Sequence, residues 1–248
     1  MKKTIAAPGG VTPRLAAERF GKSTWLLAVV CCLGVACALT LASTMMGRTG
    51  IQLLDIVSAA FNMLYAFAAA AALFFLWQLR SHSSADSFKK AGKGCLAVGV
   101  VLLLTASFLA MFYFSAYTIF GSLTPEDMAE MELTQEYIDE MWAMLPYFVL
   151  SLVCTALGGV AFMVFWRALR RLSEMAVGKS ASAGLFTGCS VVAALAGGFV
   201  LLRMFLDLTM SAGLVHTVFI LLENLAEAGV FAGITVLSQE TASALRGE

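Results

Sequence analysis

The chain contains six long runs of apolar residues, separated by short segments that carry most of the charge. A helix needs about 20 apolar residues, at a rise of about 1.5 Å per residue, to cross the hydrocarbon core of a bilayer. Each run reaches that length, so the sequence predicts an all-α fold, a polytopic transmembrane bundle of six helices. The runs cover residues 25–46, 51–77, 95–120, 141–165, 184–206 and 213–237.

The composition agrees with a protein that lies mostly inside a membrane. Hydrophobic residues make up 60% of the 248 residues and charged residues only 13%, with a mean hydropathy of +0.87. Soluble domains carry about 25% charged residues. The longest segment between predicted helices, residues 121–140, is shorter than the roughly 50 residues that a folded domain needs.

The distribution of basic residues predicts the orientation. They precede the first run, separate the second from the third and the fourth from the fifth, and recur near the C-terminus. Of the 16 Lys and Arg residues, only Arg48 and Arg203 fall on the opposite side. Short basic segments stay in the cytoplasm, so we expect both termini inside, the N-in/C-in arrangement.

Three regions follow along the chain. Residues 1–24 form a predicted cytoplasmic segment with a short interfacial helix, for which Thr12 is the N-cap and Pro13 the first helical residue. Residues 25–238 form the transmembrane domain, with an acidic outer loop at 121–140 whose Thr124 is expected to cap a short helix. Residues 239–248 form a cytoplasmic tail. The first run is too long for the 7–15 apolar residues of a signal peptide, so we expect it to be retained.

A polar group in the sixth helix is the first candidate site. Glu223 and Glu227 are one turn apart, with Asn224 beside them, near the predicted centre of the bilayer. Asn62 of the second helix lies at a similar predicted depth. A charged carboxylate there costs at least about 2.5 kcal/mol, so it must be paired, hydrated or protonated. The sequence therefore predicts a midplane polar or proton site.

A second candidate cluster is predicted near the outer surface. It combines His216 and Asp55 with Arg203 and Asp207. With the fifth helix ending at residue 206, Arg203 lies about one turn from its outer end, too shallow to pair with the midplane carboxylates. We therefore expect Glu223 or Glu227 to be protonated at neutral pH.

Small residues predict where the last two helices touch. The spacing of Ala194 with Gly198 and of Gly229 with Gly233 places small side chains on one face of each helix. Such faces allow close approach in lipid. We expect the fifth and sixth helices to pack through these four residues.

The sequence predicts no catalytic, cofactor or metal site. It contains no P-loop and no hydrolase or metalloprotease motif, and its six cysteines form no CxxC pair. No soluble basic face interleaved with aromatics predicts nucleic-acid binding. The absence of these motifs argues weakly against an enzyme.

The favoured function is a small permease or transport-type membrane subunit, multi-pass in a bacterial cytoplasmic membrane. One alternative is the membrane half of an ATP-driven transporter, with a separate cytoplasmic ATPase docked on the basic segments. Others are a sensor or assembly protein, in which the carboxylates only join helices, and a membrane-embedded enzyme. The expected partner is the lipid bilayer; another membrane subunit or a second copy in a homo-oligomer is also open.

Overall fold

The computed structural model describes residues 11–46, 52–124, 126–127, 134–210 and 214–247. These residues fold without a strand, and six helices are long and apolar enough to cross a membrane, which confirms the predicted fold class. The helices are α1 (Pro13–Lys22), α2 (Thr24–Met46), α3 (Gln52–Ser81), α4 (Ala85–Gly121), α6 (Gln135–Ala143), α7 (Leu145–Ala176), α8 (Ala183–Met210) and α9 (Leu214–Arg246).

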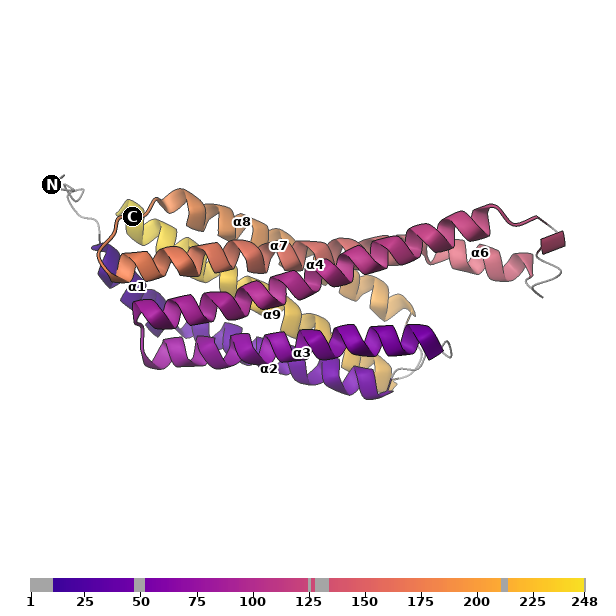
Figure 1. The fold of residues 1–248 in the computed structure, drawn as a ribbon, viewed down its shortest axis with the longest axis horizontal. Helices are drawn as coiled ribbons and strands as arrows, with labels where there is room; N and C mark the ends of the chain where they lie inside the picture. The colour runs from indigo at the N-terminus through magenta and orange to yellow at the C-terminus, as the bar shows by residue number, and fades with distance from the viewer. Residues whose placement is uncertain (1–10, 47–51, 125, 128–133, 211–213, 248) are drawn as a thin grey trace.

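The six long helices pack in a closed ring. Neighbours around the ring are α2 and α3, α3 and α4, α4 and α7, α7 and α8, α8 and α9, and finally α9 and α2. The beginning of α1 and the end of α9 lie at the same end of the bundle, as an even number of crossings requires (Figure 1). We call this end of the molecule the α1 end and the opposite end the distal end.

Helix α1 packs against the bundle at the α1 end. Its buried face presents Phe20, whose ring centroid lies 6.1 Å from that of Phe88 in α4 and 6.3 Å from that of Phe165 in α7. Arg80 at the end of α3 donates a hydrogen bond of 3.3 Å to the carbonyl of Ser23, which joins α1 to α2. The predicted short helix is therefore present, and its apolar face contacts protein.

Several helices are longer than the apolar runs that predict them. Helix α4 begins at Ala85, ten residues before the predicted run, because the side chain of Ser84 accepts a hydrogen bond from the backbone N–H of Ser87 and caps the helix. Helix α8 continues to Met210, past the predicted end at 206. Apolar runs mark the part of a helix that fits the hydrocarbon core, and polar turns extend it into water.

Helix α4 projects far beyond the ring at the distal end (Figure 1). Its 37 residues correspond to about 55 Å, well beyond the roughly 30 Å of a bilayer core. Together with α6 and α7 it extends past the distal ends of α2, α3, α8 and α9 (Figure 1). In the acidic loop that follows α4, the N–H of Asp127 donates to the Thr124 hydroxyl, as a capping residue requires.

The predicted packing of the last two long helices is right about the pair and wrong about the residues. Helices α8 and α9 are close neighbours, but Ala194 and Gly198 are exposed, and a Cβ added at Gly198 would meet nothing within 4 Å. Gly229 and Gly233 instead face α2, where added Cβ atoms would lie 2.6 Å from Cys32 Sγ and 2.5 Å from Val29 Cγ2.

The residues were predicted wrongly because the small-residue faces of α8 and α9 point toward other neighbours than expected. Helix α8 presents the other small pair to α9, with Ala193 fully buried and Gly197 against Phe231. Helix α9 has two neighbours in the ring, and its glycines serve the contact with α2. Small-residue spacing shows that a helix has a close neighbour, but it does not say which helix that neighbour is.

Candidate functional site

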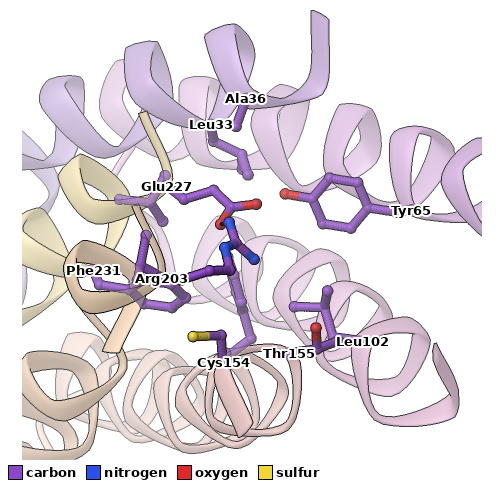
Figure 2. A pocket seen from close by; sticks show the side chains of 13 residues that line it. Leu33, Ala36, Tyr65, Leu102, Cys154, Thr155, Arg203, Glu227 and Phe231 are labelled. Carbon is purple, nitrogen blue, oxygen red and sulfur yellow. Dashed lines mark hydrogen bonds and ion pairs between the residues drawn. The ribbon is translucent and has the colours of Figure 1, made fainter. Parts of the chain in front are cut away.

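A cavity of about 50 Å³ lies in the interior of the ring. A water molecule needs roughly 10–15 Å³, so the space suits a few waters or a small cation. Polar groups on its wall are the side chains of Tyr65, Cys154, Thr155, Arg203 and Glu227 (Figure 2). All six ring helices contribute to the lining, whose other members are Leu33, Ala36, Leu102, Gly158, Phe162, Val200, Val230 and Phe231.

Arg203 of α8 is the centre of the polar wall. Its Nη2 donates to Glu227 Oε2 at 2.7 Å and to Asn224 Oδ1 at 2.8 Å, and its Nε donates to the same Asn224 oxygen at 3.0 Å. The Arg203 and Glu227 side chains are only 16% and 25% exposed. The ion pair is therefore largely removed from solvent. In such surroundings each charge depends on its partner, because removal of one leaves the other buried without a counter-charge.

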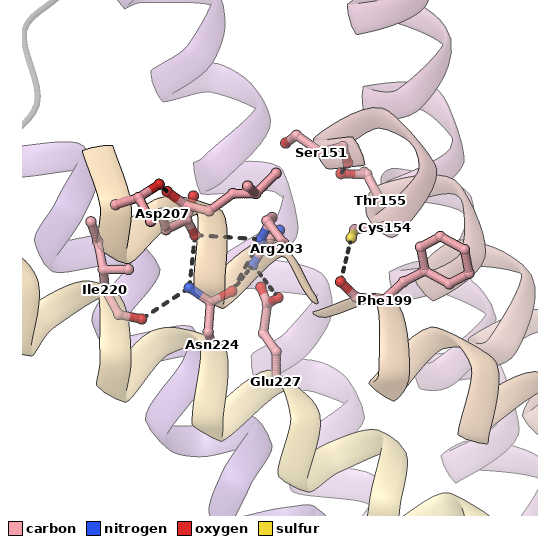
Figure 3. Close-up of polar contacts among 11 residues, drawn as sticks. Ser151, Cys154, Thr155, Phe199, Arg203, Asp207, Ile220, Asn224 and Glu227 are labelled. Atoms are coloured by element: carbon pink, nitrogen blue, oxygen red, sulfur yellow. Dashed lines mark hydrogen bonds and ion pairs between the residues drawn. The ribbon is translucent and has the colours of Figure 1, made fainter. Parts of the chain in front are cut away.

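Asp207 and Asn224 extend the network toward the distal end (Figure 3). The Asn224 amide donates to Asp207 Oδ2 at 2.9 Å and to the carbonyl of Ile220 at 3.0 Å, so this nearly fully buried side chain uses both its donor and its acceptor groups. Asp207 lies one turn from Arg203 on α8, with an ion-pair distance of 3.8 Å.

The contact between Arg203 and Glu227 corrects the division into a midplane and an outer cluster. The expectation that Arg203 is too shallow was wrong for two reasons. Helix α8 ends at Met210, which places Arg203 about 10 Å from the helix end. Side chains also lean toward the N-terminus of their own helix, and in the antiparallel pair α8 and α9 this tilts Arg203 and Glu227 toward each other.

Glu223 has a different environment from Glu227. Its Oε1 accepts a hydrogen bond of 3.4 Å from the hydroxyl of Thr40 on α2, and it does not belong to the cavity lining. The premise that neither α9 carboxylate has a basic partner is thus wrong for Glu227, which pairs with Arg203. For Glu223, the described residues include no ion pair within 4 Å, and its protonation remains a prediction.

Three predicted site residues remain, and the structure describes the side chain of one of them. Asn62 of α3 is half-buried and lies outside the cavity lining. His216 and Asp55 fall within α9 and α3, but their side chains lie outside the part of the chain that the structure describes.

Other polar residues lie at or beside the cavity; the sequence already marked Tyr65 and Thr155 as polar groups near mid-depth that could line one, but it did not single out Cys154 or Thr40. Figure 2 shows the Tyr65 hydroxyl directed across the cavity toward Glu227. Cys154 donates from its thiol to the carbonyl of Phe199 at 3.2 Å, and Thr155 bonds the carbonyl of Ser151 at 2.9 Å. Thr40 was the least expected, because Ser and Thr occur throughout these spans and nothing in the sequence distinguishes it from the others.

The cluster has more acid than base. Arg203 provides one positive charge to the two carboxylates of Asp207 and Glu227, and Glu223 lies one turn from Glu227 on α9. Low-dielectric surroundings penalise an unbalanced charge, so the excess carboxylates must share a proton or attract a cation. Among the described residues, no three His, Cys, Asp or Glu side chains come together as metal ligands. The arrangement places ionisable side chains against a small internal space inside the ring.

Comparison of the chain with protein-family models, with curated proteins and with solved structures finds no match. The six apolar helices identify an integral membrane protein, and its function has to be argued from the site itself.

Proposed function

We propose that this integral membrane protein is a small permease or transport-type membrane subunit that moves protons or small cations. Its site is the wall of the central cavity. Glu227 would exchange its ion pair with Arg203 for the transported proton or cation, with Glu223 as a neighbouring carboxylate. The observation that carries the proposal is the place of the ion pair, on a cavity to which all six ring helices contribute. Ionisable residues inside a membrane domain are expensive and usually functional.

The size of the cavity supports a small substrate. Pockets for drug-sized ligands usually measure about 300–1,000 Å³. The central cavity, at about 50 Å³, is far smaller. A proton carried by water, or a small cation, fits this space.

The α1 end gives the cavity a closed side. The aromatic rings of Phe20, Phe88 and Phe165 pack against one another there, and none of the three is more than 3% exposed. Alternating access requires one side of a site to be shut while the other is open. The contact between α1 and the ring supplies such a closed side in this conformation.

Flux measurements in proteoliposomes test the proposal. Purified protein is reconstituted with a pH-sensitive dye inside, and an imposed potassium diffusion potential drives proton entry. We expect dye acidification with the wild type, and a return to the rate of protein-free vesicles for Glu227→Gln. Glu174→Gln is the matched control, because Glu174 pairs with Arg171 outside the cavity lining. Absence of wild-type flux of protons, sodium or potassium, with folding intact, would reject the proposal.

A second candidate function has its own observation. Within the described part of the chain, the hydrogen bonds that Arg203 donates all go to α9, so the network also works as a clamp between α8 and α9. In a sensor or assembly protein this would be its whole purpose. The triple variant Arg203→Met, Asp207→Asn and Glu227→Met distinguishes the two, since apolar replacement of a complete buried network often preserves stability. A stable triple variant with full function would favour the clamp.

A further inference from the structure

Two parallel rows of side chains run along the outer face of the pair formed by α4 and α7. On α4, Lys89 and Lys93 are followed by Leu96, Val100 and Leu104, at spacings of three or four residues that keep them on one side of the helix. All five are exposed or half-buried, while the neighbouring Phe88, Gly92 and Cys95 are buried. The row is therefore the outward side of α4.

Helix α7 has a matching row in the opposite direction. Arg170 and Arg167 are followed, toward the membrane interior, by Met163 and Val160 at the same kind of spacing. Both arginines and Val160 are exposed, and Met163 is half-buried.

The close contact of the two helices sets the register of the rows. A Cβ added at Gly92 would lie 3.1 Å from the Trp166 ring and 3.6 Å from Leu169 Cβ, and one added at Gly99 would lie 2.9 Å from the carbonyl of Gly159. Lys93 therefore stands across from Arg167, and Lys89 from Arg170. Val100 and Val160 face each other about 10 Å deeper.

The cations in these rows are not held in direct ion pairs by described carboxylates, although Lys89 and Lys93 also lie close enough to Asp86 to interact with its charge. The two other basic residues nearby are paired, Lys90 with Asp86 at 2.8 Å and Arg171 with Glu174. No ion pair joins Lys89, Lys93, Arg167 or Arg170 to a described carboxylate. Four positive charges that form no ion pair with a described carboxylate therefore stand where the apolar run of α4 begins and that of α7 ends, next to a strip of exposed apolar side chains.

We propose that this surface binds an anionic phospholipid, with its phosphate headgroup between Lys89, Lys93, Arg167 and Arg170 and an acyl chain along Val100 and Val160. The charge favours an anion, since a basic residue near a membrane surface contributes to the binding of acidic lipids. The apolar strip favours a lipid over a soluble anion or an acidic protein, because exposed apolar side chains below the cations match an acyl chain. The inference does not depend on what the central cavity transports.

Native mass spectrometry of the purified full-length protein tests the proposal. The protein, in detergent, is titrated with phosphatidylglycerol or with phosphatidylcholine of the same chain length. We expect preferential retention of phosphatidylglycerol by the wild type. The double variant Lys89→Gln and Arg170→Gln should weaken phosphatidylglycerol binding roughly 30-fold. This estimate takes about 1 kcal/mol for each of the two basic residues lost from the membrane surface.

The control variant also removes one Lys from α4 and one Arg from α7, so the change in net charge is the same. In Lys90→Gln with Arg171→Gln, the lost cations are those already paired with carboxylates, and phosphatidylglycerol binding should stay near wild type. Equal loss in both double variants, or equal binding of the two lipids by the wild type, would overturn the proposal.

Competition experiments with two soluble compounds distinguish a lipid from the two other possible ligands of this surface, a simple anion and an acidic protein. Soluble glycerol phosphate should displace phosphatidylglycerol poorly, because it lacks an acyl chain, and so should polyglutamate at equal charge. Displacement by glycerol phosphate as effective as by excess lipid would overturn the lipid proposal in favour of a simple anion site. Effective displacement by polyglutamate would overturn it in favour of an acidic protein surface.

Discussion

The two halves of the bundle are held together by different forces. Most of the largest fully buried side chains lie between α1 and the cavity, and they are all apolar, Phe88, Phe165, Phe186, Leu76, Leu79, Leu169, Leu172, Met175, Ile234 and Leu237 among them. From the cavity toward the distal end, α8 and α9 are joined by Arg203, Asp207, Asn224 and Glu227.

The difference between apolar packing in one half and polar contacts in the other matters because the hydrophobic effect between helices is weak inside a bilayer. Apolar burial supplies little drive between helices when the alternative is contact with acyl chains, so the α1 half depends on close shape fit. The distal half depends on one arginine that compensates several acids, and a single change there leaves buried charge behind.

The largest expected effect is the loss of the arginine. Arg203→Ala should lower the free energy of unfolding by about 3–5 kcal/mol, because Glu227 and Asp207 remain buried without their counter-charge. Reversible unfolding in detergent measures it. Arg171→Ala is the matched control, since Arg171 is 46% exposed, against 16% for Arg203, and its pair with Glu174 should contribute about 0–1 kcal/mol. Equal effects would contradict the assigned burial of the Arg203 pair.

A somewhat smaller effect is expected at the α1 end. Phe20→Ala removes the ring between Phe88 and Phe165 and should cost about 3 kcal/mol. Hydrogen exchange should then become faster throughout α1 while the amides around Arg203 stay protected. Leu15→Ala, on the exposed side of the same helix, should change neither quantity. Exchange that rises equally in both halves would show that they are not separable.

The close contact of α9 with α2 should be sensitive to one added methyl group. Gly233→Ala places a Cβ 2.5 Å from Val29 Cγ2 and 3.4 Å from the carbonyl of Trp25, and overpacking of this kind costs about 1–3 kcal/mol. Gly198→Ala, where the space is open, should be neutral or slightly stabilising, because alanine is the better helix residue. Thermal melting of the two variants in detergent compares them. The reverse order would mean that the sequence-based choice of Gly198 as a contact was right.

The smallest effect concerns the acidic loop beyond α4. Hydrogen bonds from the Thr124 hydroxyl and from its backbone N–H hold the pKa of Asp127 below its usual value. Its contribution to local order is therefore present above the usual pKa and is lost as the pH falls through the lowered one. NMR titration should show the Thr124 amide shifting in acid with Asp127, and Asp127→Asn should remove that shift. A titration at or above the usual aspartate pKa would contradict the cap.

Much of the fold was predictable from the sequence. A helix that crosses lipid must consist of a continuous run of mostly apolar residues, so the six runs are enough to locate the six spans. Helix ends were less accurate, as at Ala85 and Met210, because polar turns continue helices beyond the hydrocarbon.

The site was predictable in its residues and not in its pairing. Glu223, Asn224 and Glu227 are conspicuous because ionisable groups in spans are costly. Their partners depend on helix ends and on side-chain direction, and an error of one turn at the end of α8 was enough to separate Arg203 from Glu227. Phe20 carries no signal that distinguishes it from other aromatics near a membrane surface, so its position against Phe165 required the fold.

Water contact in a bilayer tests the central claim most directly. In water-edited solid-state NMR of the protein in lipid, magnetisation passes from water to nearby protein groups. We expect fast transfer to the Arg203 guanidinium, which faces the cavity, and slow transfer to Phe165 and Met175, which are fully buried in the α1 half. Transfer to Arg203 as slow as that to Phe165 would show a dry network, contradict a hydrated transport site, and leave the clamp between α8 and α9 as the role of these residues.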